Sequence, residues 1–563
     1  MASVASSAMA AVVIPTDDLE TVDAVLDRAA EVNGAVEAYV EPAVDDRPRR
    51  SLTFAGWRQA ADATAALLVD LGVRPGDVVC LVLPPSIEFA VLYQALLRLR
   101  AITTGINPRM GGPERQSILE RMRPVLSVVE QGSGSPGEHA GRVVQLHEVA
   151  DPAPRPRPMV PAGRSSDPVA VVWTSGTTGL PKGALFDHAA LRAVAAGTDV
   201  LSQAGDRRLS PLPFSHVSYV TRAWDEIANG ITTIISPAPW RAETALAAMI
   251  AEEVTVAQGV PTQWALLMEL EGLSRAHLAH LRLAGTGAAR MAPSQVRSLS
   301  DRLGVPVVVR YTSTEASLGT GTRPGDPAEA VALTVGRPVP GVAMELVDEA
   351  GTPVADGEVG RVRLRSAAVM RGYVGTREGL DRGAPPPIDE VLTAGVLDEE
   401  GWITTGDFGA IGADGNLRLV GRDHELYQRG GYNVYPAEVE QAIDGLAGVA
   451  QVAVVAGEDP VLGEVGVAFV VAERGATPPD LDQLREHVAA QLADYKAPDV
   501  LVLLDELPVT PMGKVDKRSL LAAAGEAAAQ RSEQRAASRR AASLQGGGDF
   551  GNDAGAPSRT QET

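Results

Sequence analysis

Short apolar runs alternate with amphipathic stretches over most of the chain, from about residue 51 to residue 421. The runs are rich in Val, Ile and Leu and are bounded by polar residues, which is typical of buried strands. The stretches between them repeat apolar residues with the period of a helix that packs on a sheet. This alternation predicts an α/β fold with a mostly parallel sheet. The predicted strands are residues 78–83, 125–129, 169–173, 232–235, 281–283 and 305–309, and the predicted helices include residues 86–99, 244–252 and 293–303.

The pattern changes twice towards the C-terminus. Residues 344–347 and 360–364 predict a more antiparallel, β-rich part. After residue 434 the pattern restarts, which indicates a separate small α+β domain. Its predicted helices are residues 437–443 and 481–492, and its predicted strands are residues 449–455, 465–471 and 500–504. We therefore expect a large N-terminal domain of α/β layers plus a β-rich part at residues 1–423, and a small domain at residues 424–522.

Residues 523–563 differ in composition from the rest of the chain. They consist largely of Ala, Gly, Arg, Ser and Gln, and their five arginines balance five acidic residues. Such a low-complexity segment has little apolar surface to bury. We expect a tail that begins as a frayed helix and is disordered beyond it.

The overall charge restricts the class of partner. The chain has 563 residues, with 50 Lys and Arg against 71 Asp and Glu, so its formal net charge is −21. This disfavours broad binding to nucleic acids or anionic membranes. A single cysteine, Cys80, excludes an intrachain disulfide and a cysteine-based zinc site. No apolar run is long enough to span a membrane, and no basic residue precedes the apolar N-terminal stretch, so we expect a cytoplasmic protein.

The distribution of lysine points to chemistry. The chain has only four lysines, and all its other basic residues are arginine. The two side chains differ where a compact, mobile point charge is needed, because an ammonium can reach oxygens that a planar guanidinium cannot. The four lysines are Lys182, Lys496, Lys514 and Lys517.

One lysine lies in a glycine-rich segment directly after a predicted strand. Residues 174–183 read TSGTTGLPKG. Glycines let the backbone approach an anion closely, hydroxyls donate hydrogen bonds, and Lys182 adds a positive charge. The spacing is not that of the Walker A loop. The segment predicts a phosphate-binding loop of another kind.

Together with four later segments, this loop resembles the motif set of the adenylate-forming superfamily, which includes acyl-CoA synthetases, luciferases and the adenylation domains of peptide synthetases. The later segments are residues 310–315 (RYTSTE), 405–407 (TGD), 421–440 (from GR to GGYNVYPAEVE) and 508–517 (PVTPMGKVDK). The resemblance covers residues 51–520. It implies that a carboxylate attacks the α-phosphorus of ATP, giving an acyl-adenylate and pyrophosphate. Both reactants are anionic, so such catalysis relies on positioning and on cations.

The resemblance implies roles for the charged groups. Lys514 would bridge the substrate carboxylate and the α-phosphate, and Lys182 would hold the departing phosphates. Glu315, with Thr178, would bind Mg²⁺, a hard cation suited to one carboxylate plus phosphate oxygens. The implied loop residues are Thr174, Ser175, Gly176, Thr177, Thr178 and Gly179.

The resemblance also implies a nucleoside site. Tyr311 would stack on adenine, Asp407 would accept hydrogen bonds from the ribose, and Arg422 would contact ribose or phosphate. Core packing for Tyr311, and structural ion pairs for the other two, are the alternatives. The implied nucleotide-binding residues outside the loop are Gly287, Ala288, Ala289, Tyr311, Thr312, Thr314, Asp407 and Arg422. Thr312 stands where the family usually has glycine, and Ala289 replaces a common proline.

A pocket for the acyl group is implied beside the nucleotide, with His216 at its gate. The residues implied to line it are Ser215, His216, Tyr219, Trp224, Gly285 and Ser317. Small residues at positions 312, 313, 316 and 317 leave room for a chain or a ring. The sequence does not specify the acid.

Residues 430–436 (GGYNVYP) are similar to the CoA-ligase version of their motif. In the family, the small C-terminal domain is mobile: it rotates about a hinge, here at His424, between two half-reactions. The residues implied for CoA and the hinge are His424, Arg429, Gly430, Gly431 and Lys496. We therefore expect an acid–CoA ligase that uses ATP, Mg²⁺ and coenzyme A.

Different acceptors are compatible with the same adenylation motifs. The activated group could pass to a carrier-protein thiol or to an amine, including diazotase-like use of nitrite, and a luciferase-like oxygenase stays open. A stand-alone amino-acid adenylation module commonly has Asp after the phenylalanine matching Phe214, where this chain has Ser215. A non-enzymatic scaffold protein would also be compatible with the fold. The expected partner is a small-molecule carboxylic acid, with no nucleic acid and no membrane span, and a homodimer is open.

Overall fold

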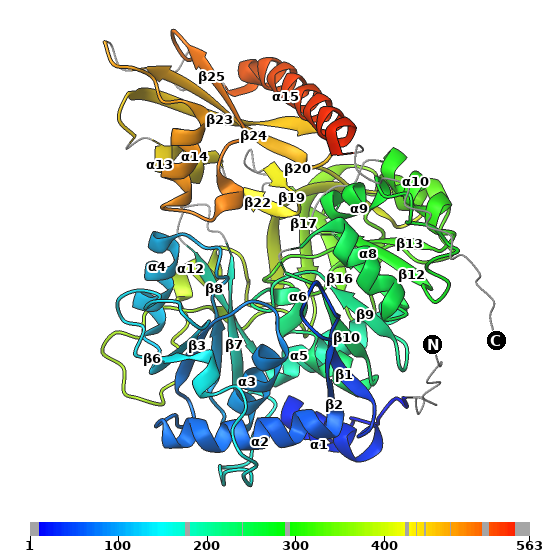
Figure 1. Ribbon diagram of the computed structural model, residues 1–563, viewed down its shortest axis with the longest axis vertical. Coiled ribbons are helices and arrows are strands. Elements are labelled where there is room, and N and C mark those ends of the chain that lie inside the picture. Colours follow the sequence, from blue (N-terminus) through cyan, green and yellow to red (C-terminus); the bar gives the residue numbers. More distant parts are fainter. Residues whose placement is uncertain are drawn as a thin grey trace, which may run out of the picture.

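The computed structural model describes residues 11–174, 181–238, 240–259, 261–287, 293–348, 350–422, 427–434, 436–443, 446–472, 475–508 and 517–546. Figure 1 shows a large N-terminal domain below and a small C-terminal domain above it. The expected mixed α/β architecture with a smaller second domain is confirmed.

The first sheet of the N-terminal domain carries the predicted phosphate loop. Its strand order is β18-β8-β7-β4-β3-β5-β6. The strands from β7 to β6 are parallel, whereas β8 and β18 add antiparallel at one edge. The strands are β3 (Val78–Val82), β4 (Ile102–Gly105), β5 (Leu126–Val129), β6 (Arg142–Gln145), β7 (Pro168–Thr174), β8 (Lys182–Asp187) and β18 (Gly372–Tyr373).

The second sheet has the order β15-β14-β13-β12-β11-β9-β10-β1-β2, and it is parallel from β13 to β1. Strand β12 continues to Gly287, beyond the predicted 281–283, because parallel pairing with both neighbours accommodates its small residues. The strands are β1 (Glu37–Glu41), β2 (Arg50–Thr53), β9 (Arg207–Ser210), β10 (Thr232–Ile235), β11 (Val256–Gly259), β12 (Leu283–Gly287), β13 (Val307–Tyr311), β14 (Thr320–Gly321) and β15 (Arg337–Pro338).

Helices cover both sheets. Helix α3 is buried from Phe89 to Arg98, as expected for a helix that is apolar on all sides. Its one buried charge, Arg98, pairs with Asp27 at 2.9 Å and with Asp62 at 3.1 Å. The helices are α1 (Val22–Val32), α2 (Phe54–Asp70), α3 (Ile87–Arg98), α4 (Gly112–Met122), α5 (His188–Gly197), α6 (Val217–Val220), α7 (Ala223–Ala228), α8 (Ala242–Ala251), α9 (Pro261–Met268), α10 (Pro293–Leu303), α11 (Ala328–Leu333) and α12 (Glu390–Ala394).

The predicted β-rich part is an antiparallel sheet of order β16-β17-β19-β20. It carries Asp407 on β19, in register with Arg422 on β20. The expected boundary at 423/424 falls outside the described residues. The strands are β16 (Ala343–Val347), β17 (Val359–Arg365), β19 (Trp402–Ile411) and β20 (Leu417–Arg422).

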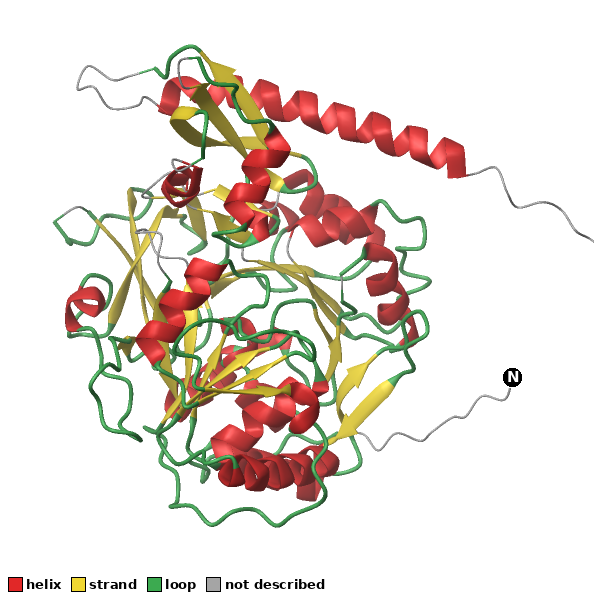
Figure 2. Ribbon diagram, turned by 60° about the vertical axis from the view of Figure 1, so that its left-hand side comes forward, coloured by secondary structure: helices red, strands yellow, loops and turns green. Residues whose placement is uncertain are grey.

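The C-terminal domain is a sheet of order β22-β21-β24-β23, with β25 parallel to β24. Helices α13 and α14 pack in one apolar cluster, and α15 packs in another (Figure 2, where α15 is the long helix at the top). The elements are β21 (Tyr427–Arg429), β22 (Tyr432–Val434), α13 (Pro436–Ile443), β23 (Val449–Asp459), β24 (Gly463–Ala472), α14 (Leu481–Ala489), β25 (Val500–Leu504) and α15 (Lys517–Gly546).

Helix α15 runs across residue 522, the expected end of the small domain. The helix runs to Gly546 and buries Leu520, Ala524 and Ala528 against β23. The alanine-rich composition favours helix, and the small side chains, four residues apart, allow close packing. A Cβ added to Gly457 would lie 2.7 Å from Ala528 Cβ. Residues 547–563 lie outside the described part of the chain.

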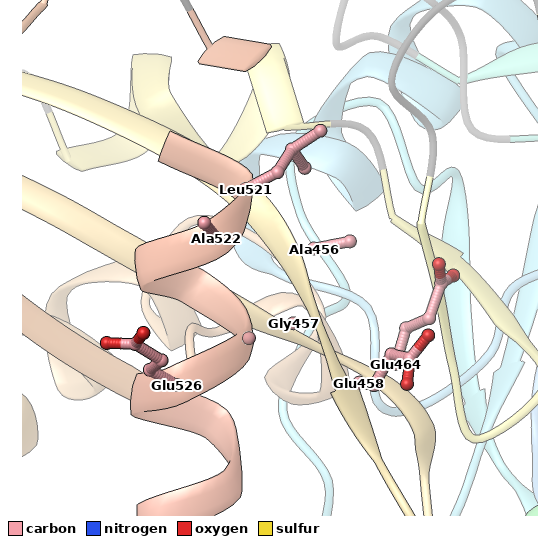
Figure 3. A pocket seen from close by; sticks show the side chains of 8 residues that line it. Ala456, Gly457, Glu458, Glu464, Leu521, Ala522 and Glu526 are labelled. Atoms are coloured by element: carbon pink, nitrogen blue, oxygen red, sulfur yellow. The ribbon is translucent and has the colours of Figure 1, made fainter. Parts of the chain in front are cut away.

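A pocket lies between α15 and β23 (Figure 3). Its titratable lining residues are Glu458, Glu464 and Glu526. Because these side chains are all acidic, the pocket does not fit the phosphates of ATP or CoA.

Three contacts dock the C-terminal domain on the start of α4. The Lys496 ammonium lies 2.6 Å from Glu114 in a buried ion pair. Arg109 pairs with Asp494 at 2.6 Å. Gly111 lies so close that a Cβ there would be 2.2 Å from the carbonyl oxygen of Gln491. We call these contacts the docking clasp.

Candidate active site

The predicted phosphate loop connects an antiparallel hairpin at the edge of the first sheet. Thr174, the last residue of β7, lies opposite Lys182, the first residue of β8. The Thr174 hydroxyl donates to the Lys182 carbonyl at 3.5 Å. The other predicted loop residues, Ser175, Gly176, Thr177, Thr178 and Gly179, fall outside the described residues. The hairpin therefore fixes both ends of the loop.

A tyrosine connects Lys182 to Glu315. The Lys182 ammonium lies 5.5 Å from the centre of the Tyr373 ring, a cation–π contact. The Tyr373 hydroxyl donates to Glu315 Oε1 at 2.6 Å. Strand β18, which carries Tyr373, pairs directly with β8. The structure thus brings the two predicted phosphate-site charges together.

Sequence reasoning missed Tyr373. No local pattern marks it, because its role depends on the pairing of β18 with a strand far away in the sequence. The tyrosine fixes one oxygen of the Glu315 carboxylate. A single positioned carboxylate suits Mg²⁺ that is also bound by substrate phosphates.

The predicted nucleoside residues also come together. The Tyr311 hydroxyl donates to Asp407 Oδ2 at 2.8 Å, and both residues are buried. The Tyr311 ring also packs in an apolar cluster. The Asp407 backbone N–H donates to the Thr405 hydroxyl at 3.2 Å, which holds the backbone that carries the carboxylate. The end of β13 and the middle of β19 thus present one aromatic ring and one carboxylate side by side.

The remaining nucleotide-site predictions are described only in part. Gly287 ends β12 and needs to be glycine, because a Cβ there would lie 2.7 Å from the Arg310 carbonyl oxygen. Thr312 is exposed and donates to the Ser313 carbonyl, and Thr314 follows in the same turn. The backbone of Arg422 pairs with that of Asp407. Ala288 and Ala289 fall outside the described residues.

His216 caps the N-terminus of α6. Its Nδ1 accepts from the Ser218 backbone N–H at 3.2 Å, which places the proton of the neutral ring on Nε2. The residue is exposed, and desolvation by the surrounding protein atoms lowers the pKa of His216 to about 4. The imidazole is therefore neutral near pH 7. Ser215, next to it, packs against Gly105 at the end of β4.

Two predicted acyl-pocket residues, Tyr219 and Trp224, are buried. The Tyr219 ring stacks on Phe214 at 3.7 Å, and its hydroxyl is 3.0 Å from that of Tyr39. Trp224 is buried, and its indole N–H donates to the Thr16 hydroxyl at 3.3 Å. Both rings belong to the largest apolar cluster of the N-terminal domain.

Two other predicted acyl-pocket residues, Gly285 and Ser317, are small. Gly285 lies in β12, where a Cβ would be 3.4 Å from Gln258 Cγ. Ser317 has a left-handed backbone, φ 56°, and its buried hydroxyl has no hydrogen-bond partner among the described residues. Arg222, which sequence reasoning missed, donates to Gln258 Oε1 at 3.0 Å.

In this arrangement, the two charged residues predicted for CoA, Arg429 and Lys496, form ion pairs within the protein. Arg429 forms two hydrogen bonds to Asp499, at 2.5 and 2.8 Å. Lys496 is buried against Glu114, so it is not available to a phosphate here. Gly430 and Gly431 form the turn between β21 and β22, with φ of 58° and 81° that favour glycine. His424 and Lys514 fall outside the described residues.

Comparison with known families decides the assignment. Residues 26–374 match the AMP-binding enzyme family, and residues 438–514 match the AMP-binding enzyme C-terminal domain. The chain belongs to the AMP-binding enzyme family. The expected membership of the adenylate-forming superfamily is confirmed.

Relatives of this AMP-binding enzyme match it over almost their full length. It is 33% identical over 539 residues to the 3-[(3aS,4S,7aS)-7a-methyl-1,5-dioxo-octahydro-1H-inden-4-yl]propanoyl:CoA ligase of Mycobacterium tuberculosis, covering 90% of this chain and 99% of the relative. Amide bond synthetase McbA from Marinactinospora thermotolerans is similar in structure, with a TM-score of 0.77, 27% identity, and 89% and 99% of the two chains covered. A malonyl-CoA ligase with methylmalonyl-CoA and AMP bound gives a TM-score of 0.70 at 30% identity, covering 84% of this chain and 96% of that chain.

Within the part of this AMP-binding enzyme that the structure describes, no helix is both long enough and apolar enough to cross a membrane.

Proposed function

We propose that the protein is an ATP-dependent carboxylic acid–CoA ligase that works through an acyl-adenylate and releases AMP and pyrophosphate. The observation that carries this proposal is the convergence of Lys182, Tyr373 and Glu315 beside the phosphate-loop hairpin. The full-length similarity to a CoA ligase supports it. ATP, Mg²⁺ and coenzyme A are the small molecules that this activity requires.

In the first half-reaction, an oxygen of the substrate carboxylate attacks the α-phosphorus of ATP. The bond to the β-phosphate breaks, and pyrophosphate leaves. Lys182 stabilises the charge that develops on the leaving phosphates, and Lys514 is proposed to bridge carboxylate and α-phosphate. Glu315, oriented by Tyr373, is suited to hold Mg²⁺, which would offset phosphate charge.

The nucleoside is proposed to lie between β12 and β19. Tyr311 contributes an aromatic face for adenine. Asp407 accepts one hydrogen bond from Tyr311, and each carboxylate oxygen has a second lone pair, so it can accept further bonds from ribose hydroxyls. The neutral imidazole of His216 adds no charge near the acyl group.

In the second half-reaction, the thiol sulfur attacks the acyl carbon, the bond to AMP breaks and the thiol proton is released. The Gly430–Gly431 turn is the proposed backbone surface for the pantetheine arm. An amine is the second candidate acceptor, and the similarity to an amide bond synthetase favours it over a carrier-protein thiol.

A direct test combines the purified protein with ATP, Mg²⁺ and a broad panel of acids, with and without CoA. We expect acid-dependent pyrophosphate release, and a thioester detected by mass spectrometry only when CoA is present. Lys182→Ala is expected to abolish both. Adenylate without thioester, together with amide formation from an amine panel, would replace CoA by an amine as the acceptor.

We also keep a cytoplasmic location and a homodimer as predictions. Cell fractionation tests the first. Size-exclusion chromatography with light scattering tests the second.

A further inference from the structure

Arg222, between α6 and α7, points towards the ends of β11 and β12. Its Nη1 donates to Gln258 Oε1 at 3.0 Å. The Gln258 side chain in turn lies over Gly285, where a Cβ would be 3.4 Å from Gln258 Cγ. Gly285 belongs to the predicted acyl pocket, and His216, at its predicted gate, precedes Arg222 on the same segment. The guanidinium therefore lies at the border of the region expected to hold the acid.

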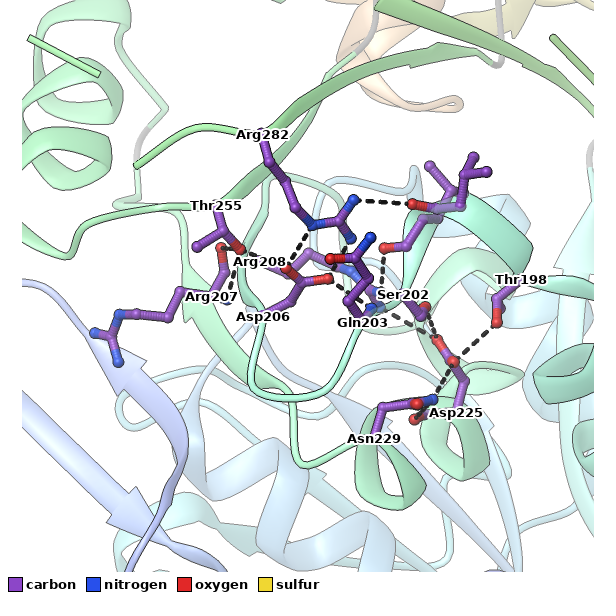
Figure 4. A network of polar contacts seen from close by, with 12 residues as sticks. Thr198, Ser202, Gln203, Asp206, Arg207, Arg208, Asp225, Asn229, Thr255 and Arg282 are labelled. Atoms are coloured by element: carbon purple, nitrogen blue, oxygen red, sulfur yellow. Dashed lines mark hydrogen bonds and ion pairs between the residues drawn. The ribbon is translucent and has the colours of Figure 1, made fainter. Parts of the chain in front are cut away.

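The two acidic residues that follow Arg222 also bind other groups, and Figure 4 shows those around Asp225. Arg208 lies 3.4 Å from Asp225 and 3.2 Å from Glu226. Glu226 also accepts from Thr233. The groups that donate to Asp225 are Thr198, Ser202, Arg208 and Asn229. Arg222 itself makes no ion pair with any residue that the structure describes.

The cost of burying the Arg222 charge outweighs the attraction of the two nearby carboxylates. Burial and the like charges of Arg208 and Arg310 lower the pKa of Arg222 to about 10, against the opposing charges of Asp225 and Glu226. Arg222 is nevertheless only partly buried. Any of its side-chain nitrogens that is buried has a hydrogen-bond partner. Its remaining N–H groups therefore reach accessible space. Arg310, a further cation that acts on Arg222, has two buried nitrogens without a hydrogen-bond partner among the described residues.

A guanidinium in this state is a preorganised anion site. It is partly buried, is held by one neutral amide, and keeps a planar set of donors that fits a carboxylate or sulfonate. A monoanionic acid would place only apolar groups there and leave these donors unpaired, which is costly.

We propose that Arg222, held by Gln258, binds a second anionic group of the substrate acid, so that the enzyme prefers acids carrying a carboxylate or sulfonate remote from the carboxylate that is activated. This inference rests on the proposed acid–CoA ligase function. It adds a substrate class that the adenylation motifs do not specify.

The test compares acids of matched size that differ in one group: monocarboxylic acids, the corresponding dicarboxylic acids, and carboxylic acids with a sulfonate in place of the second carboxylate. For the wild type we expect kcat/KM in pyrophosphate release to be about 10- to 100-fold higher for the preferred dianion than for its monoanionic match. Comparison of the carboxylate and sulfonate arms identifies the group.

Two variants probe the same guanidinium differently. Arg222→Met removes the charge, and Gln258→Glu keeps the volume but pairs Arg222 internally. Both are expected to reduce the dianion preference to within about twofold of unity, with little change for monoanionic acids. Arg297→Met, at an exposed position on α10, is the matched control and should keep the preference. A wild type without the preference, or variants that retain it, would overturn the proposal.

Calorimetric binding of the dianionic acids separates this inference from the proposed function. Binding that depends on Arg222 without any pyrophosphate release would support the anion site and refute the ligase. Thioester formation without an Arg222-dependent preference would support the ligase and refute the anion site. Absence of both binding and activity would refute both.

Discussion

Tyr373 is the residue on which the proposed phosphate site depends most directly. It contacts Lys182 through its ring and Glu315 through its hydroxyl. The ring contact adds little charge stabilisation by itself. The hydroxyl contact restricts the carboxylate to one orientation, which is what a metal–phosphate site needs.

We predict that Tyr373→Phe lowers kcat for acid-dependent pyrophosphate release by about 10- to 100-fold, with a smaller effect on KM for the acid. The reason is loss of the Glu315 orientation while the ring stays over Lys182. Tyr93→Phe is the control, because its hydroxyl donates to the Val220 carbonyl in the core. That variant should lose stability but keep kcat. Equal losses of kcat in both variants would contradict the role of Tyr373.

His188 predicts a dependence of stability on pH. The ring is buried, its Nδ1 accepts from the Val22 N–H at 3.1 Å, and burial lowers its pKa to about 4. In the unfolded chain its pKa is near 6.5, so between these values the unfolded state binds more protons. The free energy of unfolding should therefore fall as pH drops from about 6.5 to 4, by at most about 3 kcal/mol from this residue.

Urea denaturation of the wild type and of His188→Asn between pH 4.5 and 8 measures this. The variant should be less stable at pH 8 but should lose less stability on acidification. His280→Asn, at an exposed position, should follow the wild type. A wild-type slope that His188→Asn leaves unchanged would assign the acid sensitivity to other groups.

Residues of the candidate site were predictable from the sequence where they lie in short local motifs. Tyr311, Asp407, Glu315 and Lys182 lie in short motifs, and the structure brings them together in two pairs. Tyr373 and Arg222 lie in no such motif and were missed. Their side-chain directions depend on how α6, α7 and β18 pack against distant elements, which the local sequence does not record.

At the scale of elements, apolar runs predicted the strands well. The run 232–235 coincides with β10, and the run 500–504 coincides with β25. The segment after residue 283 was missed because Ala, Gly and Thr lack the apolar signal of a strand. The length of helix α15 was not predictable, because its apolar contact uses alanine, the same residue that gives the segment its low-complexity composition.

Arg531 attaches this helix to the sheet. It pairs with Asp459 at 2.9 Å and with Asp499 at 2.5 Å, and Asp499 is the residue that holds Arg429. We predict that Arg531→Ala destabilises the C-terminal domain by about 1–3 kcal/mol, because two largely buried carboxylates lose a partner. Hydrogen exchange of β23 and α15 measures this. Arg535→Ala, at an exposed position on the same helix, should leave the exchange rates unchanged. Similar exchange rates in the two variants would show that the Arg531 ion pairs contribute little to stability.

At the scale of the whole molecule, the docking clasp sets how the two domains meet. The buried Lys496–Glu114 pair and the close approach of Gly111 to Gln491 are specific to this arrangement. No sequence pattern could have revealed them, because each joins residues of separate domains. In this arrangement Tyr432, directly after the Gly430–Gly431 turn, lies beside Arg109 of the N-terminal domain. The turn proposed for CoA thus lies next to the large domain.

Two adjacent glycines allow this arrangement to be tested. A Cβ at Gly111 would lie 2.2 Å from a backbone oxygen of Gln491, whereas a Cβ at Gly112 would lie 4.0 Å from that of Ala490. Gly111 has φ −66°, which any residue adopts, so alanine there adds no backbone strain. Gly111→Ala should therefore oppose this docking without unfolding the large domain.

We predict that Gly111→Ala lowers CoA thioester formation by about tenfold or more while acid-dependent pyrophosphate release changes by less than about twofold, since a backbone contact cannot relax as a side chain can. Gly112→Ala should leave both rates near those of the wild type. Rapid-quench measurement of adenylate and thioester in single turnover separates the two steps. An equal fall in both steps would mean that the clasp serves stability alone. Loss of pyrophosphate release with retained transfer from added acyl-adenylate would assign this arrangement to adenylation.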